Sequence, residues 1–221
     1  MKGIIFDLDG VLIHTDEFHY RAWKQIADKI GAPFDRKRND LLRGVSRMES
    51  LEIILEGTPT QYTADEKKAL AEEKNGVYRE LLKTLTRQDV AAEVRLTLTE
   101  LKAQGWKLAI GSSSKNARFI LQQVELIDEF DAISDGNNIT NSKPDPEVFL
   151  KAAEFLGLEP ADCYVVEDAS AGIAAANAGN FAAIGIGAAA HEPSAQYALT
   201  TFSDLLQVVN REIKKWKHEN G

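Results

Sequence analysis

The first predicted strand of the chain runs directly into two acidic residues, and this junction constrains the fold more than any other segment. The apolar run Ile4-Ile5-Phe6 is short and continuous, which is typical of a strand buried on both faces of a sheet. Asp7 and Asp9 follow at once, one position apart. Ligands of open α/β sheets bind beyond the carboxyl ends of the strands. The pattern therefore predicts both carboxylates at the active-site edge of such a sheet.

The two carboxylates also predict a cation. Side chains held this close repel each other unless a cation or a shared proton lies between them. Mg²⁺ takes oxygen ligands and is commonly held by one or two carboxylates together with a substrate phosphate. A calcium loop opening at Asp7 would need glycine and glutamate where the chain has Leu12 and Phe18, so that site is excluded. A solvated turn after an edge strand is the less favoured alternative.

Length and composition limit the class of protein. The 221 residues, 44% of them hydrophobic, suffice for one large core or for a core domain with a smaller one. A net charge of −8 disfavours nucleic acid as a partner, since that binding needs Lys and Arg to neutralise phosphates. No apolar run approaches the ~20 residues of a membrane span, and the early acids argue against a signal peptide. The single cysteine, Cys163, reads as a buried strand residue. We expect a soluble, cytoplasmic monomer with no nucleic-acid or membrane partner.

The first part of the chain after this strand is helical in pattern. Residues 17–30 place apolar side chains at four-residue steps, and Gly31 and Pro33 end that helix. The segment 35–88 is charged and helical throughout, with its apolar periodicity concentrated in residues 51–55 and 64–85.

The rest of the chain alternates between helices and strands. We predict strands at residues 107–110, 132–134, 164–166 and 181–186, with helices at 96–104, 117–124, 146–156, 169–178 and 203–216 and a loop at 188–190. Such alternation predicts a parallel sheet with helices on both faces. The predicted fold is α/β: a Rossmann-like core of residues 1–14 and 91–221, with an α-helical cap of residues 15–90 inserted into it.

Further polar residues follow other predicted strands. Ser112 stands where a strand passes into a helix, and the free N–H groups of a helix start can hold an anion. A simple serine N-cap is the alternative. Pro144 holds Lys143 extended, so that Lys143 can pair with a phosphate and with Asp7. Glu167 and Asp168 again follow a buried strand, although one of them could be an acidic helix cap.

The order and spacing of these residues resemble the four motifs of the haloacid dehalogenase superfamily of phosphotransferases. The resemblance implies that Asp7 attacks phosphorus and forms an aspartyl phosphate, while Asp9 acts as general acid and base. It implies that Ser112 and Lys143 hold the non-bridging oxygens. It also implies a Mg²⁺ ion held by a set of acids: Asp7, Asp9 through its backbone carbonyl, Glu167 and Asp168.

The predicted cap is similar to that of the β-phosphoglucomutase family within this superfamily. The segments that carry the similarity are Arg43-Gly44-Val45-Ser46-Arg47 and Lys74-Asn75 in the cap and Ser114-Lys115-Asn116 in the core. The resemblance implies a catalytic role for His19 at the hinge, although a packing histidine is the alternative. It implies a substrate-binding set: Thr15, Trp23, Gly44, Val45, Ser46, Arg47, Ser50, Lys74, Ser114, Lys115 and Asn116. For Trp23, core packing is the expected main role.

The resemblance also implies a reaction. A β-phosphoglucomutase interconverts β-glucose 1-phosphate and glucose 6-phosphate, with β-glucose 1,6-bisphosphate as the phosphoryl-donating intermediate. The enzyme must hold this phosphosugar at both ends, so it needs a second phosphate site opposite Asp7, and the fork of Arg47 suits phosphate. The alternatives are a sugar-phosphate phosphatase and a silent binding protein. The complete set of acids argues against the latter.

Overall fold

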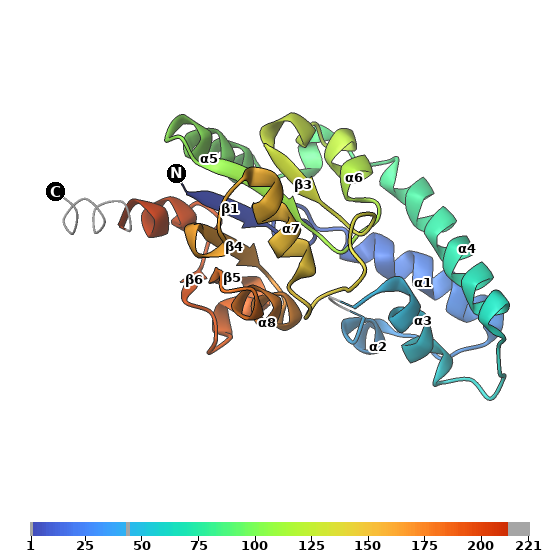
Figure 1. Ribbon diagram of the computed structural model, residues 1–221. Helices are drawn as coiled ribbons and strands as arrows, with labels where there is room; N and C mark the ends of the chain where they lie inside the picture. The colour runs from blue at the N-terminus through green and yellow to red at the C-terminus, as the bar shows by residue number, and fades with distance from the viewer. Residues whose placement is uncertain (1, 43–44, 212–221) are drawn as a thin grey trace.

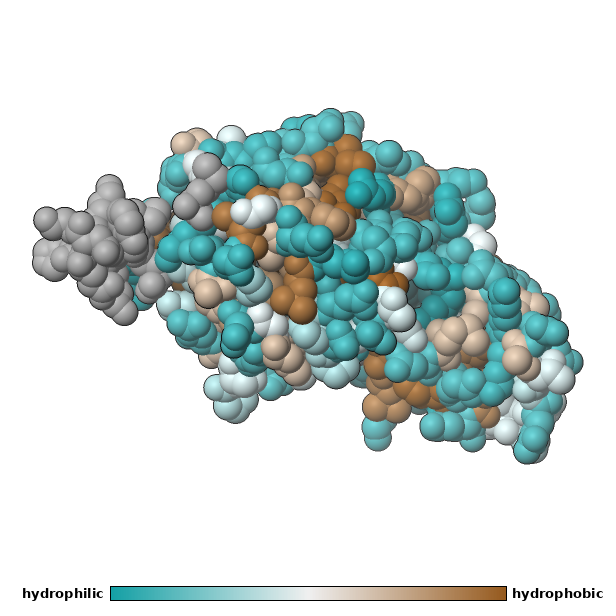
Figure 2. Space-filling model, in the orientation of Figure 1, coloured by the Kyte–Doolittle hydropathy of each residue, from teal (hydrophilic) through white to brown (hydrophobic). Residues whose placement is uncertain are grey.

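The computed structural model describes residues 2–42 and 45–211. Figure 1 shows a sheet with helices on both faces and, at one end of it, a group of helices that follows the first strand. On the face seen in Figure 2, hydrophilic residues predominate, and hydrophobic residues gather over α2 and α3 and in several places over the α/β part. In the described residues, no helix combines the length and the apolar character that a membrane span requires.

The sheet has six strands in the order β3-β2-β1-β4-β5-β6, and every neighbouring pair is parallel. Phe6 at the end of β1 pairs in register with Ile110 of β2 and with Val166 of β4. These three strands therefore end at the same level, and the residues that follow them share one edge. The strands are β1 (Gly3–Phe6), β2 (Lys107–Gly111), β3 (Ala132–Ser134), β4 (Cys163–Glu167), β5 (Ala182–Ile186) and β6 (Tyr197–Leu199).

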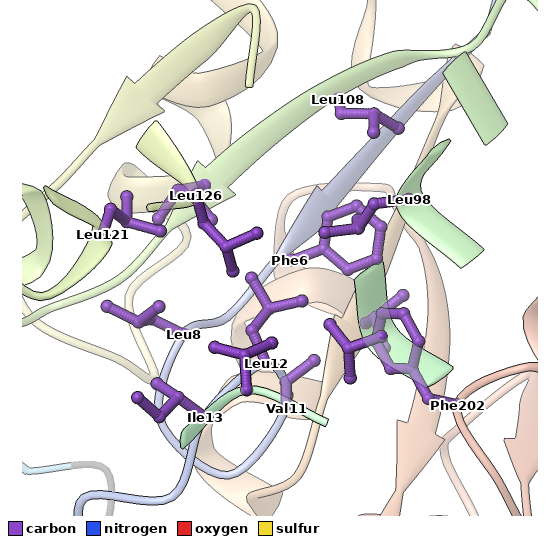
Figure 3. Packing of buried hydrophobic residues seen from close by; sticks show 14 of the residues in the cluster. Phe6, Leu8, Val11, Leu12, Ile13, Leu98, Leu108, Leu121, Leu126 and Phe202 are labelled. Atoms are coloured by element: carbon purple, nitrogen blue, oxygen red, sulfur yellow. The ribbon is translucent and has the colours of Figure 1, made fainter. Parts of the chain in front are cut away.

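Both faces of the sheet are covered, which explains the continuous apolar run in β1. Ile5 faces a cluster that includes residues of α7 and α8, whereas Ile4 and Phe6 face the opposite cluster. Figure 3 shows Phe6 on that second side, packed with Leu98 and Phe202. The covering helices are α5 (Ala92–Ala103), α6 (Ala117–Gln123), α7 (Glu147–Leu156) and α8 (Ser170–Ala178), with short 3-10 helices η1 (Arg87–Asp89), η2 (Ile127–Glu129), η3 (Pro160–Asp162) and η4 (Gly187–His191).

Four helices between β1 and η1 have a hydrophobic cluster of their own. They are α1 (Asp16–Ile30), α2 (Arg36–Asp40), α3 (Arg47–Leu55) and α4 (Ala64–Leu82). The cluster includes Trp23, Ile26 and Ile54, all buried. Local signals set the helix ends: Gly31 adopts the left-handed conformation after α1, as expected for a glycine C-cap. Ser46 and Glu49 form a capping box at the start of α3.

The α/β class, the parallel sheet and the buried Cys163 are confirmed. Several boundaries differ. Helix α5 begins at residue 92 rather than 96, and residues 188–190 belong to η4 rather than to a loop. Strand β6 was not predicted: it lies at the edge of the sheet and only Leu199 of its three residues is buried, so it lacks the buried run that marks the equally short β3. The predicted helix 203–216 is helical over 204–211, and its remainder lies outside the described residues.

The packing of α5 against the sheet gives a stability prediction. Leu98 is fully buried, whereas Leu96 on the same helix is 71% exposed. We expect Leu98→Ala to lower the free energy of unfolding by about 2–5 kcal/mol, because it removes buried methyl groups and leaves a cavity. Leu96→Ala should change it by less than about 0.5 kcal/mol. Urea unfolding of both variants measures this, and equal losses would contradict the assigned packing.

Candidate active site

Strands β1 and β4 end at the same edge of the sheet, and the acidic residues at their ends form a cluster. Asp7 donates its backbone N–H to the carbonyl of Val166 at 3.0 Å, which fixes the chain just beyond β1. Carboxylate oxygens of Asp7, Glu167 and Asp168 lie within 4.8 Å of one another. The Lys143 ammonium lies 2.6 Å from Asp7 Oδ1 and 2.5 Å from Glu167 Oε1. The predicted pairing of Lys143 with Asp7 is thus present.

The electrostatics of this cluster fit a hard cation. Burial raises the pKa of Asp168 to about 8, and the charges of Asp7 and Glu167 raise it further. Burial also raises the pKa of Glu167, against the opposing effect of Lys143. One ammonium cannot balance three carboxylates, so oxygen donors and negative charge remain to hold an ion such as Mg²⁺. The donor set, with no nitrogen or sulfur ligand among the three, suits this ion.

Two glycines let the backbone approach these acids. Gly10 has a φ of +84°, and a Cβ at this position would lie 2.0 Å from Asp168 Oδ2. A Cβ at Gly172, in α8, would lie 2.0 Å from Glu167 Oε1. Both acids are therefore held against bare backbone. The sequence did not single out Gly172, since a glycine within a short helix does not indicate which side chain packs against it.

Asp9 is turned toward the helical side of the site. Thr15 Oγ1 donates to the Asp9 carboxylate, and the Tyr78 hydroxyl lies 3.0 Å from the same Thr15 oxygen. Burial raises the pKa of Asp9 to about 7; the Thr15 hydrogen bond opposes this and the Asp7 charge adds to it. A carboxyl with this pKa can both accept and donate a proton near neutral pH.

A cavity of about 720 Å³ opens between the sheet edge and the helices α1, α3 and α4, a volume in the range of small-molecule sites. The acids come from the ends of β1 and β4. Arg47, Lys74 and Lys115 add positive charge to the lining. The cavity thus offers a ligand both carboxylates and cations. Of the predicted site residues it is lined by Asp7, Asp9, His19, Trp23, Val45, Ser46, Arg47, Ser50, Lys74, Ser112, Ser114, Lys115, Asn116, Lys143, Glu167 and Asp168.

Arg47 is held by two side chains of α4. Its Nη1 donates to Glu72 Oε1 at 2.8 Å, and its Nη2 donates to Asn75 Oδ1 at 3.0 Å. The same Asn75 oxygen accepts from Asn116 Nδ2 at 3.0 Å. Asn75 therefore links the group of helices α1 to α4, the helical group, to the loop that follows β2.

Lys74 lies in an aromatic enclosure. It is 3% exposed, and its Nζ lies 2.9 Å from His19 Nδ1 and 4.9 and 4.5 Å from the ring centres of Trp23 and Tyr78. Burial, together with the charge of Arg47, lowers the pKa of Lys74 to about 7. Burial and Lys74 together lower the pKa of His19. His19 is therefore a neutral partner of Lys74 near pH 7.

Among the described residues of the predicted set, Thr15 is not part of the cavity lining; it contacts Asp9. Gly44 lies outside the described residues. Trp23 packs in the helical cluster, as expected, and also borders the cavity. Tyr78 and Glu72 were missed. Tyr78 lies four residues after Lys74, so it shares the same helix face; that spacing was the available signal.

Three comparisons with known proteins agree. The model of the haloacid dehalogenase-like hydrolase family matches residues 1–180. The chain is 42% identical over 220 residues to the β-phosphoglucomutase of Bacillus subtilis, covering 98% of this chain and 97% of that protein. A phosphorylated-carbohydrate phosphatase of Thermotoga maritima is 32% identical over 80% of both chains.

Among solved structures, the β-phosphoglucomutase of Clostridium difficile superposes with a TM-score of 0.90 at 36% identity, over 98% of each chain. The resemblance drawn from the sequence motifs is confirmed by these matches. The chain therefore belongs to the haloacid dehalogenase-like hydrolase family, as an enzyme homologous to β-phosphoglucomutase.

Proposed function

We propose that the protein is a Mg²⁺-dependent β-phosphoglucomutase that interconverts β-D-glucose 1-phosphate and D-glucose 6-phosphate through β-glucose 1,6-bisphosphate. The observation that carries this proposal is one cavity lined both by the acidic cluster at the sheet edge and by the Arg47 guanidinium from the helices. The full-length similarity to a β-phosphoglucomutase supports it.

In this reaction Asp7 is the nucleophile. Its oxygen forms a bond to phosphorus as the bond from phosphorus to the sugar oxygen breaks, which leaves an aspartyl phosphate. Lys143, held between Asp7 and Glu167, offers N–H donors to the phosphoryl oxygens, and Ser112 offers a hydroxyl. Asp7, the Asp9 carbonyl, Glu167 and Asp168 would hold Mg²⁺, which when bound neutralises charge on the transferring group.

Asp9 moves the proton. It gives a proton to the sugar oxygen that leaves and takes one from the sugar hydroxyl that attacks in the return step. A pKa of about 7 suits both directions. The Thr15 hydroxyl holds this carboxyl beside the helical group, and we propose that residues 15–90 act as a cap whose closure over the core, residues 1–14 and 91–221, turns Asp9 toward the substrate.

The other phosphate lies on the cap side in our proposal. Arg47 supplies a planar fork for it, and Lys74 and Lys115 add charge, while Ser114 and Asn116 present polar groups from the core. Trp23, Val45, Ser46 and Ser50 border the sugar, and His19 holds Lys74. We expect the enzyme to act as a cytoplasmic monomer.

A sugar-phosphate phosphatase is the second candidate, favoured by the similarity to the Thermotoga maritima phosphatase. In that case water would take the phosphoryl group from Asp7, and no distal phosphate site would be needed. ³¹P NMR of the protein with β-glucose 1-phosphate, Mg²⁺ and a trace of bisphosphate separates the two. We expect glucose 6-phosphate to accumulate; inorganic phosphate as the main product would identify a phosphatase.

The assignment of the nucleophile gives a direct prediction. Asp7→Asn should abolish phosphoryl transfer, because an amide is a poor nucleophile, while the circular dichroism spectrum stays unchanged. Turnover is measured with β-glucose 1-phosphate and bisphosphate. Substantial activity in the folded variant would remove Asp7 from this role.

Arg47 distinguishes the mutase from simple hydrolysis. Arg47→Ala should reduce mutase turnover by about tenfold to a hundredfold, the effect of losing roughly 1.5–3 kcal/mol of charged hydrogen bonding. Hydrolysis of acetyl phosphate, which has no distal phosphate, should change little. If both rates fall equally, Arg47 supports the fold of the helical group instead.

The low pKa of Lys74 predicts proton uptake on binding. At pH 8 a lysine with a pKa of about 7 is mostly neutral, and a nearby phosphate dianion raises that pKa, so binding should take up about one proton. Calorimetry of bisphosphate binding to Asp7→Asn, in buffers of different ionisation enthalpy, measures this. In the double variant Asp7→Asn/Lys74→Met, the proton uptake on binding should be smaller by about one proton.

Lys67→Met is the matched control, because Lys67 lies on the same helix and pairs with Glu52. It should leave the proton uptake unchanged. Equal proton uptake in Asp7→Asn and in Asp7→Asn/Lys74→Met would contradict the assignment of this proton to Lys74.

A further inference from the structure

Glu72 is an acid in the lining of a cavity that is proposed to receive two phosphates. It lies on α4, and its Oε1 accepts a hydrogen bond from Arg47 Nη1 at 2.8 Å. Arg47 Nη2 is engaged by Asn75 at 3.0 Å. Both terminal nitrogens of the guanidinium therefore have partners on α4 before any ligand arrives.

The two partners of Arg47 differ in what they do to an incoming phosphate. Asn75 is neutral and accepts also from Asn116, so it positions Arg47 without repelling an anion. Glu72 carries a negative charge and accepts an N–H of Arg47 Nη1, and both residues belong to the cavity lining. A phosphate dianion must displace this carboxylate or bind beside it.

The pair is weak enough to be displaced. The Glu72 side chain is 62% exposed, whereas that of Arg47 is 23% exposed. Glu72 can therefore turn into solvent while Arg47 stays in place. Exposed ion pairs of this kind contribute little, up to about a fivefold change in an equilibrium constant.

We infer that Glu72 is a specificity-determining residue that competes with the distal phosphate for Arg47 and limits how tightly that phosphate is held. The inference rests on the proposed mutase function. Such a limit has a use there, since the bisphosphate must leave the site and rebind with its ends exchanged. A phosphatase would not need it.

The test compares Glu72→Gln with Glu73→Gln. The two variants change neighbouring residues of α4 and the same charge, but Glu73 pairs with Lys29 and is not part of the cavity lining. Binding of β-glucose 1,6-bisphosphate is measured by calorimetry with Mg²⁺ in the Asp7→Asn background. At about 0.02 M ionic strength we expect Glu72→Gln to lower Kd two- to fivefold and Glu73→Gln to leave it unchanged.

Ionic strength and a double variant sharpen the result. At about 0.5 M salt the gain from Glu72→Gln should largely disappear, because exposed charges are then screened. In an Arg47→Ala background the gain should also disappear, since nothing is left to compete for. An undiminished gain without Arg47, or a Kd for Glu72→Gln equal to or above that of Glu73→Gln, overturns the inference.

The same data separate this inference from the proposed function. If Arg47→Ala alone leaves the Kd of the bisphosphate unchanged, the distal phosphate site itself is wrong, and the inference fails with it. If Arg47→Ala weakens binding and Glu72→Gln has no effect, only the competition by Glu72 is overturned.

Discussion

The unequal count of charges at the end of β1 governs the site. Three carboxylates meet one ammonium there, and the surrounding burial raises the pKa values of Glu167 and Asp168. The register of the sheet holds these residues together. Phe6 pairs with Ile110 and with Val166 in three adjacent parallel strands, so the residues that follow lie at one edge. A divalent cation would offset the negative charge that the lysine leaves unbalanced, and it would then neutralise charge on a phosphoryl group bound there. The acids, the lysine and the covered sheet thus form one physical unit.

The helical group supplies what this unit lacks. It brings Arg47 and Lys74 to the same cavity as the acids, and Thr15 holds Asp9 and lies against the Tyr78 hydroxyl. The positions of its cations depend on neighbours within the helices: Asn75 and Glu72 on Arg47, and His19 on Lys74. Chemistry and recognition are therefore built from separate parts of the chain that meet at one cavity.

Local patterns predicted most of the architecture for identifiable reasons. A strand buried on both faces reads as a continuous apolar run, and glycines at 31 and 157 end their helices in the left-handed conformation. The edge strand β6 escaped because only one of its three residues is buried, and the 3-10 helix η4 is too short to show a period. Among site residues, those that follow strands were found. Tyr78 was missed because a tyrosine on a helix looks the same whether it packs or positions a hydroxyl.

The sequence by itself determined the fold class, the position of the acids at strand ends and the chemical types available to the site, because these depend on periodicity and on neighbours along the chain. Tertiary structure alone decided which distant side chains meet. The pairing of Arg47 with Glu72 joins residues from α3 and α4, and the hydrogen bond between Asn116 and Asn75 joins the loop after β2 to α4. The pKa values of Asp9 and Lys74, both about 7, belong to this second group, since burial sets them and burial is a property of the assembled fold.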